Sequence, residues 1–296
     1  MTIIWLDGEG CQDVSRVGGK VANLSRLAAD YRVPTGFCLT TKAFHQWAAL
    51  ADDGRADEVP ASLRGQLTDT YHEMGRRCGA DQPSVAVRSS AMDEDGRFAS
   101  FAGQYETFLN RVGEQEVAAA VLRCWHATKA DRVTEYRERN GLSLEEIEMA
   151  VLVQQLIPAD SSAVIFSANP VTNNRDQVVI NASWGLGESI VGGTVTPDTY
   201  IVDKRDLSVT ESVVAEKNCM TVSIPGGTKD VAVPRFLRSQ STLSETQLVE
   251  MARLAISLEE QMGSPVDLES AYSGDDLYLL QCRLITTLAD EKNEDG

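Results

Sequence analysis

Asp267–Arg283 reads DLESAYSGDDLYLLQCR. Two β-prone runs flank a Ser-Gly-Asp-Asp turn, and this pattern predicts a β-hairpin. Residues two apart share a face of a strand, so we expect Gln281 and Arg283 to point the same way, with Glu269 joining them from the partner strand. A carboxylate and an amide oxygen suit Mg²⁺, and an adjacent arginine suits charge that develops on a phosphoryl group. A polar strand face with one salt bridge is the alternative interpretation.

The segments before this hairpin predict a mixed fold. Ser244–Gly263 begins at a serine cap and repeats apolar residues at helical spacing, which predicts an amphipathic helix. Short β-prone runs and further helical patterns alternate through the rest of the chain, and this order predicts the α+β class. The strongest of them are helical patterns at Val21–Leu27, Leu63–Cys78 and Glu114–Asn140, and β-prone runs at Ser84–Arg88, Glu148–Ile157, Ala163–Phe166, Val178–Ile180 and Thr199–Val202.

Two glycine motifs fail the tests for common nucleotide sites. Gly19-Lys20 is followed by Val21, where a P-loop needs Ser or Thr. Gly185-Leu186-Gly187 lacks the third glycine of a dinucleotide fingerprint. Taken alone, the Gly-Gly-Lys turn is therefore interpreted as an ordinary loop, and Rossmann-type dinucleotide binding at the second motif is disfavoured.

Arg88 stands at the end of a predicted strand and is followed by Ser89-Ser90-Ala91. An arginine in this setting can present its guanidinium, with backbone donors beside it, to a phosphate. The alternative is a solvated arginine at a strand terminus. The small residues of Ser100–Gln104 would also let backbone approach a ligand closely.

The charge balance limits the partners of this chain. Its 296 residues include 27 Lys and Arg against 44 Asp and Glu, a formal net charge of −17, which argues against a nucleic-acid or anionic-membrane surface. No apolar stretch approaches the roughly 20 residues that span a bilayer, and the first residues lack the pattern of a signal peptide. We therefore expect a cytoplasmic protein with no nucleic-acid or membrane partner.

The cysteines and histidines do not indicate a reactive site. The six cysteines are scattered without a CxxC pair, so we expect reduced, mostly buried thiols rather than disulfides or a zinc site. The three histidines, His45, His72 and His126, all fall in predicted helices. None lies in a glycine-rich loop.

In combination, seven motifs resemble the N-terminal ATP-binding domain of the phosphoenolpyruvate synthase, pyruvate phosphate dikinase and rifampicin phosphotransferase family. They occur in the family's order and cover residues of about 15 to 287. Individually the motifs are weak, but their order is specific. They are Gly18–Leu24 with Val33–Phe37, Val85–Ala91, Ala99–Thr107, Met149–Gln154, Asn181–Glu188, Pro197–Tyr200, and Asp267–Glu269 with Leu280–Arg283.

The resemblance implies an ATP-grasp-like fold of two lobes, with ATP in the cleft between them. By matching motifs, Lys20, Arg88, Gly103 and Thr107 should line the phosphate side, and Gln154 the adenine side. Glu269 and Gln281 would hold Mg²⁺, and Arg283 would stabilise the transferring phosphate. These roles suit phosphoryl transfer, because its catalysis consists mostly of positioning the reactants and neutralising charge. The catalytic residues implied in this way are Lys20, Arg88 and Arg283.

The same resemblance gives an expected domain division and reaction. We expect an N-terminal lobe at residues 1–110, a C-terminal lobe at 111–288, and an acidic disordered tail at 289–296. In the family, ATP is cleaved to AMP and phosphate while the β-phosphoryl group moves to a histidine on a mobile domain. No such histidine is visible in this chain, so we expect it to be supplied in trans.

Two other functions remain open from the sequence. A stand-alone ATP-grasp kinase or ligase would act directly on a small-molecule acceptor. A non-catalytic nucleotide-binding module would need no acceptor, but the complete set of charged residues argues against it, since a degenerate site would be expected to lose some of them.

Overall fold

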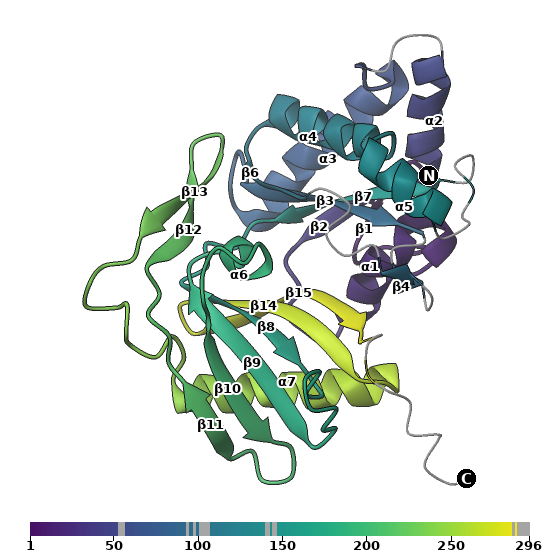
Figure 1. Ribbon diagram of the computed structural model, residues 1–296. Coiled ribbons are helices and arrows are strands. Elements are labelled where there is room, and N and C mark those ends of the chain that lie inside the picture. The colour runs from purple at the N-terminus through teal and green to yellow at the C-terminus, as the bar shows by residue number, and fades with distance from the viewer. Residues whose placement is uncertain are drawn as a thin grey trace, which may run out of the picture. The chain divides into compact units, whose positions relative to one another are not determined.

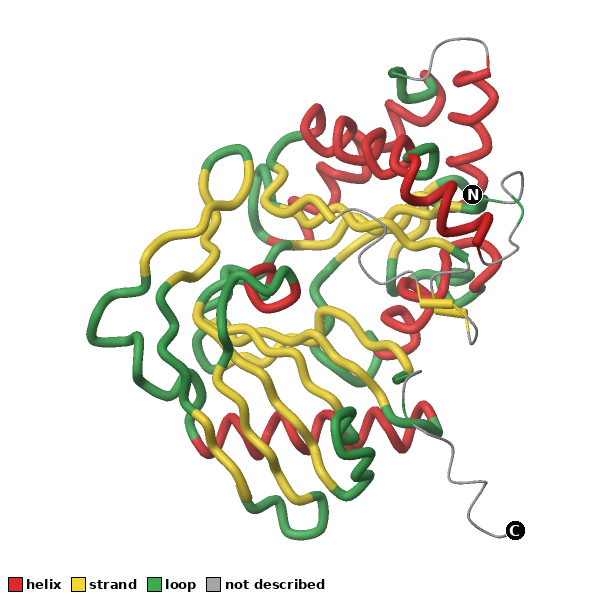
Figure 2. The backbone as a smooth tube through the Cα atoms, in the orientation of Figure 1, coloured by secondary structure: helices red, strands yellow, loops and turns green. Residues whose placement is uncertain are grey.

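The computed structural model describes residues 1–52, 57–92, 95–96, 99–100, 107–139, 143, 147–285 and 288. Helices and antiparallel sheets occur throughout (Figures 1 and 2), which confirms the predicted α+β class. The chain divides into two compact units. Unit 1 comprises Met1–Ile157 with Ser223–Thr228, and unit 2 comprises Pro158–Val222 with Lys229–Gly296.

Unit 1 is built on a five-stranded antiparallel sheet in the order β1-β2-β7-β3-β6. Its central strands β7 and β3 are almost wholly buried, because helices cover both faces (Figure 1). The strands are β1 (Ile3–Trp5), β2 (Gly36–Leu39), β7 (Met149–Gln155), β3 (Val85–Ala91) and β6 (Thr107–Arg111), with a separate short pair β4 (Asp95–Gly96) and β5 (Ala99–Ser100).

The helices of unit 1 divide between the two faces. The helices α2 (Thr41–Asp52), α3 (Ala61–Cys78) and α4 (Glu114–Ala127) pack on one face and build the main core around Trp47 and Trp125, whose rings stack at 5.7 Å. The helix α1 (Val14–Leu27) contacts β3 and β7 on the other face. A fifth helix, α5, spans Asp131–Arg139.

The boundary between the two units lies after Ile157, later in the chain than the expected boundary after residue 110. Residues 111–157 belong to unit 1 because α4 packs against β3 and β6, and because β7 pairs with β2 on one side and β3 on the other. The expected tail, residues 289–296, lies outside the described residues.

Unit 2 is built on a six-stranded sheet in the order β11-β10-β9-β8-β14-β15. One long helix, α7 (Glu245–Met262), lies along one face of this sheet (Figures 1 and 2). The strands are β11 (Val209–Val213), β10 (Asp198–Asp203), β9 (Gln177–Trp184), β8 (Ser161–Phe166), β14 (Val266–Ser273) and β15 (Asp276–Leu284); the short helix α6 (Glu188–Val191) and the two-stranded sheet of β12 (Cys219–Ile224) and β13 (Gly227–Ala232) complete the described elements.

The helix α7 begins and ends as its sequence predicts. Ser244 and Gln247 form a reciprocal capping box at its start, and Gly263 adopts the left-handed conformation at its end. Leu248, Met251 and Leu258 are buried against the sheet. No helix in the described part of the chain is long and apolar enough to cross a membrane.

A buried ion pair fixes the segments around the start of β10. Asp198 and Lys217 are each 0% exposed, and the Lys217 Nζ donates to Asp198 Oδ1 at 2.5 Å. The same carboxylate accepts hydrogen bonds from the backbone of Ala215 (2.8 Å) and from both the backbone (2.8 Å) and the hydroxyl (2.6 Å) of Thr242, and Tyr200 donates to it as well (3.1 Å). Its charge is therefore compensated by several donors at once, which a buried charge requires.

We predict that Asp198→Asn lowers the free energy of unfolding by about 3–5 kcal/mol, because it leaves the Lys217 ammonium buried without a counter-charge. Urea denaturation measures this. The control Asp275→Asn lies in an exposed turn and should change the same quantity by less than about 0.5 kcal/mol. Adding Lys217→Met to Asp198→Asn should recover part of the loss; a double variant that is no more stable than the single variant would contradict a charge-based cause.

Candidate functional site

The strand register of unit 1 brings three of the predicted residues onto one face of its sheet. Arg88 pairs with Thr107 on β6 and with Leu152 on β7, and Gln154 pairs with Ala86 on β3. Paired residues and residues two apart share a face. Arg88, Thr107 and Gln154 therefore lie on one face, which is the face that α1 covers, because Ser90 on the same face donates to Val17 O of α1 at 2.8 Å.

Lys20 reaches this face from α1. Its Nζ donates to the carbonyl oxygen of Ser89 at 3.1 Å, directly beside Arg88 in the chain. The two cations thus come from distant parts of the sequence to neighbouring positions. Arg88 is buried to 8% exposure and Lys20 is half-buried.

Gly18 allows α1 to approach β3 this closely. Its φ of 76° is left-handed and interrupts the helix, and a Cβ at this position would lie 2.4 Å from Ser90 Oγ and 2.6 Å from Ser90 O. Only glycine can readily adopt this positive φ and also leave room for Ser90. The Gly18-Gly19-Lys20 segment is therefore a kinked helical segment rather than the simple turn that its sequence predicts.

Gln154 and Thr107, which share this face with Arg88, differ from each other in solvent exposure. Gln154 is almost fully buried, and its Nε2 lies 3.5 Å from Pro34 O, a long contact for a hydrogen bond. Thr107 is exposed at the start of β6. Gly103 lies outside the described residues.

In unit 2, the terminal hairpin confirms the predicted geometry. Glu269 pairs with Gln281, and Asp267 pairs with Arg283, across β14 and β15. These side chains lie on the face opposite α7, because Tyr272, on the other face of β14, donates to Glu250 of α7 at 2.6 Å. Glu269, Gln281 and Arg283 therefore share one face.

Asp267 is a member of this group that the sequence reasoning missed. It accepts from Arg283 Nε at 2.7 Å and from Arg283 Nη2 at 2.6 Å, so it fixes the plane of the guanidinium. Burial raises the pKa of Asp267 above its ordinary value, and Arg283 offsets part of the rise. As pH falls, Asp267 therefore takes up a proton earlier than an exposed aspartate would. The available signal was its position two residues before Glu269 on the same strand face.

The donor set of the hairpin fits a divalent cation with few protein ligands. Glu269 offers a carboxylate and Gln281 an amide oxygen on adjacent strands, which are hard oxygen donors. Asp267 already balances Arg283. Among the described residues no cluster of three or more His, Cys, Asp or Glu side chains is placed to hold a metal, so most ligands of a bound Mg²⁺ would come from phosphate and water.

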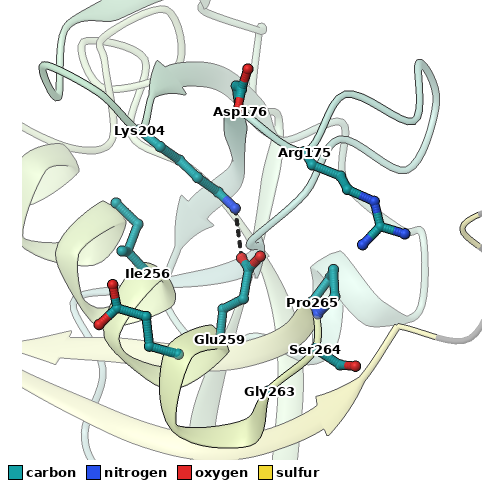
Figure 3. Close-up of a pocket in the computed structure, with 9 residues that line it drawn as sticks. Arg175, Asp176, Lys204, Ile256, Glu259, Gly263, Ser264 and Pro265 are labelled. Atoms are coloured by element: carbon teal, nitrogen blue, oxygen red, sulfur yellow. Dashed lines mark hydrogen bonds and ion pairs between the residues drawn. The ribbon is translucent and has the colours of Figure 1, made fainter. Parts of the chain in front are cut away.

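A separate hollow of about 460 Å³ lies in unit 2 at the C-terminal end of α7 (Figure 3). It contains none of the predicted site residues. Lys204 points across it to Glu259, at 2.6 Å, and Arg175 and Glu260 also line it. Lys204 is neutralised there by Glu259, and the charged residues of the lining carry both signs, so the lining favours neither an anionic nor a cationic ligand.

The three histidines lie on helices, as predicted. His45 is on α2, His72 on α3 and His126 on α4, and each Nε2 is within 3.5 Å of an exposed or half-exposed carboxylate. None occupies a glycine-rich loop.

We predict that Gly18→Ala lowers the free energy of unfolding by at least about 2 kcal/mol, because it combines a left-handed backbone with a clash against Ser90. Gly65→Ala is the matched control. Gly65 lies on α3 with open space around it, so alanine should raise stability by about 0.5–1 kcal/mol. Thermal unfolding of both variants checks the pair. Equal effects at the two positions would contradict the close packing of α1 on β3.

Comparison with known proteins agrees with this assembly of motifs. The family described as "Pyruvate phosphate dikinase, AMP/ATP-binding domain" matches residues 55–296. The chain is 35% identical to "Probable phosphoenolpyruvate synthase" of Methanocaldococcus jannaschii, over 99% of this chain and 27% of that protein. It is 33% identical to "Phosphoenolpyruvate synthase" of Pyrococcus furiosus, over 98% of this chain and 44% of that protein, and 36% identical to "Uncharacterized phosphotransferase YvkC" of Bacillus subtilis, over 93% and 34%.

Among solved structures, D-alanyl-alanine synthetase A of Vibrio cholerae matches 90% of this chain and 58% of its own, at 14% identity and a TM-score of 0.35, which is too low to support an argument. The chain spans less than half the length of the three relatives named above. By the match to its profile and by these relatives, the chain belongs to the pyruvate phosphate dikinase AMP/ATP-binding domain family.

Proposed function

We propose that this chain binds ATP with Mg²⁺ and cleaves it as the ATP-dependent part of a dikinase-type phosphotransferase. The observation that carries the proposal is the gathering of the matched residues on two sheet faces. Lys20 contacts the backbone next to Arg88 on the α1 face of unit 1, and Glu269, Gln281 and Arg283 share one face of unit 2. Membership of the family supports the choice of ATP as the ligand.

The unit 1 residues have the chemistry for a polyphosphate. Lys20 and Arg88 supply two positive charges in a protein whose net charge is −17, so an anion would gain little from the rest of the molecule. Thr107, and Gly103 by its motif, would add neutral donors. Gln154 would contact the adenine, as the resemblance implies.

The unit 2 residues have the chemistry for the reacting end. Glu269 and Gln281 would hold Mg²⁺, which supplies charge neutralisation to the phosphate oxygens when bound. Arg283, held in plane by Asp267, would stabilise negative charge on the transferring phosphoryl group. An ATP-grasp-like fold is part of this proposal.

The acceptor is proposed to be a histidine outside the three in this chain. The family pattern gives AMP and phosphate as products and sends the β-phosphoryl group to a histidine on a phosphohistidine domain. A small-molecule acceptor is the second candidate. A cytoplasmic location fits six free cysteines, most of them buried.

We predict that Glu269→Ala abolishes ATP turnover while the far-ultraviolet circular dichroism spectrum and the unfolding midpoint stay close to wild type. The reason is that a carboxylate does most to hold a dication. Gln281→Ala should reduce turnover less, because its ligand is neutral. The control Glu245→Ala removes an exposed carboxylate at the start of α7 and should retain full turnover. Full activity of Glu269→Ala at ordinary Mg²⁺ concentration would contradict the assignment of Glu269 as a Mg²⁺ ligand.

We also predict that the isolated chain, given ATP labelled at the β-phosphate, accumulates no stoichiometric phosphohistidine. His45, His72 and His126 are fixed on helices, and a shuttle needs mobility. Label should move only after a histidine-bearing partner protein or a small acceptor is added, and chromatography of the nucleotide product then separates AMP, expected for a dikinase, from ADP, expected for a simple kinase. Acid-labile label on one of the three histidines would overturn the proposal that the acceptor is supplied in trans.

A further inference from the structure

One cross-strand row runs through five strands of unit 2. Gln281, Glu269, Val164, Asn181 and Thr199 pair in turn from β15 to β10. Paired residues in antiparallel strands share a face, so Asn181 and Thr199 lie on the same face as Glu269. Adjacent strands are about 4.8 Å apart, which puts Asn181, two strands away, on the order of 10 Å from Glu269.

The side chain of Asn181 is held in one orientation. Thr199 Oγ1 donates to Asn181 Oδ1 at 2.9 Å, which occupies the acceptor atom of the amide. The two hydrogens on Nδ2 remain as donors, and Nδ2 makes no hydrogen bond with any residue that the structure describes. The residue is half-buried. It therefore presents an oriented, neutral donor on this face.

Ser183, the next residue of β9 on this face, has an unused hydroxyl. Its Oγ is buried, at 1% residue exposure, and has no hydrogen-bond partner within the described part of the chain. Ser162, which pairs with Ser183, instead donates to Gly185 O at 2.7 Å. A buried hydroxyl without an acceptor is unfavourable for folding, so its position suggests a partner other than the residues that the structure describes.

We propose that Asn181 and Ser183 donate hydrogen bonds to a phosphoryl oxyanion at the metal end of the site. This inference rests on the proposed function. The row that contains Asn181 also contains the carboxylate and amide proposed for Mg²⁺, and Arg283 lies two residues from Gln281 on the same face. An anionic oxygen attracted by a Mg²⁺ held at Glu269 and Gln281 would find neutral donors along β9, where a further cation would add a large desolvation cost.

The phosphoryl group could be borne by either of two molecules. It belongs either to the polyphosphate of the bound nucleotide or to the acceptor that receives it. The chemistry that Asn181 recognises is the same in both cases, so binding and transfer are measured separately.

The test compares Asn181→Asp with Asn174→Asp by calorimetric titration of Mg²⁺-ATP and of AMP. Both changes add one negative charge. The carboxylate introduced by Asn181→Asp would still accept from Thr199 but would lack both amide donors, whereas Asn174 lies in an exposed loop where its Oδ1 only accepts, from the backbone of Asp176 at 2.9 Å. We expect Asn181→Asp to weaken Mg²⁺-ATP binding roughly tenfold or more, with AMP binding unchanged. Asn174→Asp should leave both unchanged.

Ser183→Ala separates a ligand contact from a structural role. It should leave the unfolding midpoint of the ligand-free protein unchanged or raise it, because the hydroxyl has no partner there among the described residues, yet weaken Mg²⁺-ATP binding by roughly threefold or more. A lower midpoint with unchanged binding would show that the hydroxyl serves the fold, and would overturn its part in the proposal.

The remaining outcomes show which molecule carries the phosphoryl group. They also show whether this inference alone is wrong or the proposed function is wrong as well. Unchanged Mg²⁺-ATP binding by Asn181→Asp with slower transfer to an added acceptor would assign the contact to the acceptor's phosphoryl group. Equal behaviour of Asn181→Asp and Asn174→Asp in both measurements would overturn the inference alone. Failure of the wild-type chain to bind Mg²⁺-ATP would overturn the proposed function, and this inference with it.

Discussion

Strand register is the constraint on which both groups of matched residues depend. Arg88, Thr107 and Gln154 come together only because β3 pairs with β6 and β7 in one alignment, and Glu269 meets Gln281 only because β14 and β15 do the same. A slip of one residue would send every side chain of a strand to the opposite face. Helices pack on both faces of the unit 1 sheet, and α7 packs on one face of the unit 2 sheet, so a slipped register would bury charged side chains and expose apolar ones.

Register alone does not hold a charged side chain in position. Lys20 contacts the arginine strand only because Gly18 lets α1 pack against Ser90, and Arg283 is held in plane only because Asp267 accepts from two of its nitrogens. In both cases a residue that is not proposed to contact ATP fixes the position of a cationic side chain that is proposed to contact it. In a protein with a net charge of −17, fixed cations matter, because the long-range field of the molecule repels the anion that they would bind.

Local patterns in the sequence predicted the elements better than their assembly. The terminal hairpin and α7 follow from alternation, a turn signal and a capping box, all of which lie within a few residues. The middle position of β7 could not be predicted in this way, because its partners β2 and β3 lie far upstream, and so the expected boundary between lobes fell too early. The meeting of Lys20 with the Arg88 strand was expected only from the family resemblance. Asp267 was missed as a partner of Arg283, because one aspartate beside Glu269 has no distinctive pattern of its own.

The position of β2 in the unit 1 sheet has a consequence for how this family's domain can be delimited. The family profile begins at residue 55, yet β1 and β2 precede it, and β2 pairs with Val151–Gln154 along one side of β7. A fragment beginning at residue 55 would keep the pairing of β7 with β3 but would leave β7, with the apolar sequence Met149–Val153, as an edge strand whose backbone groups on the β2 side are unpaired. Such an edge is a template for intermolecular strand pairing. The matched region thus lacks the strand that protects the β2-facing edge of β7 in this sheet.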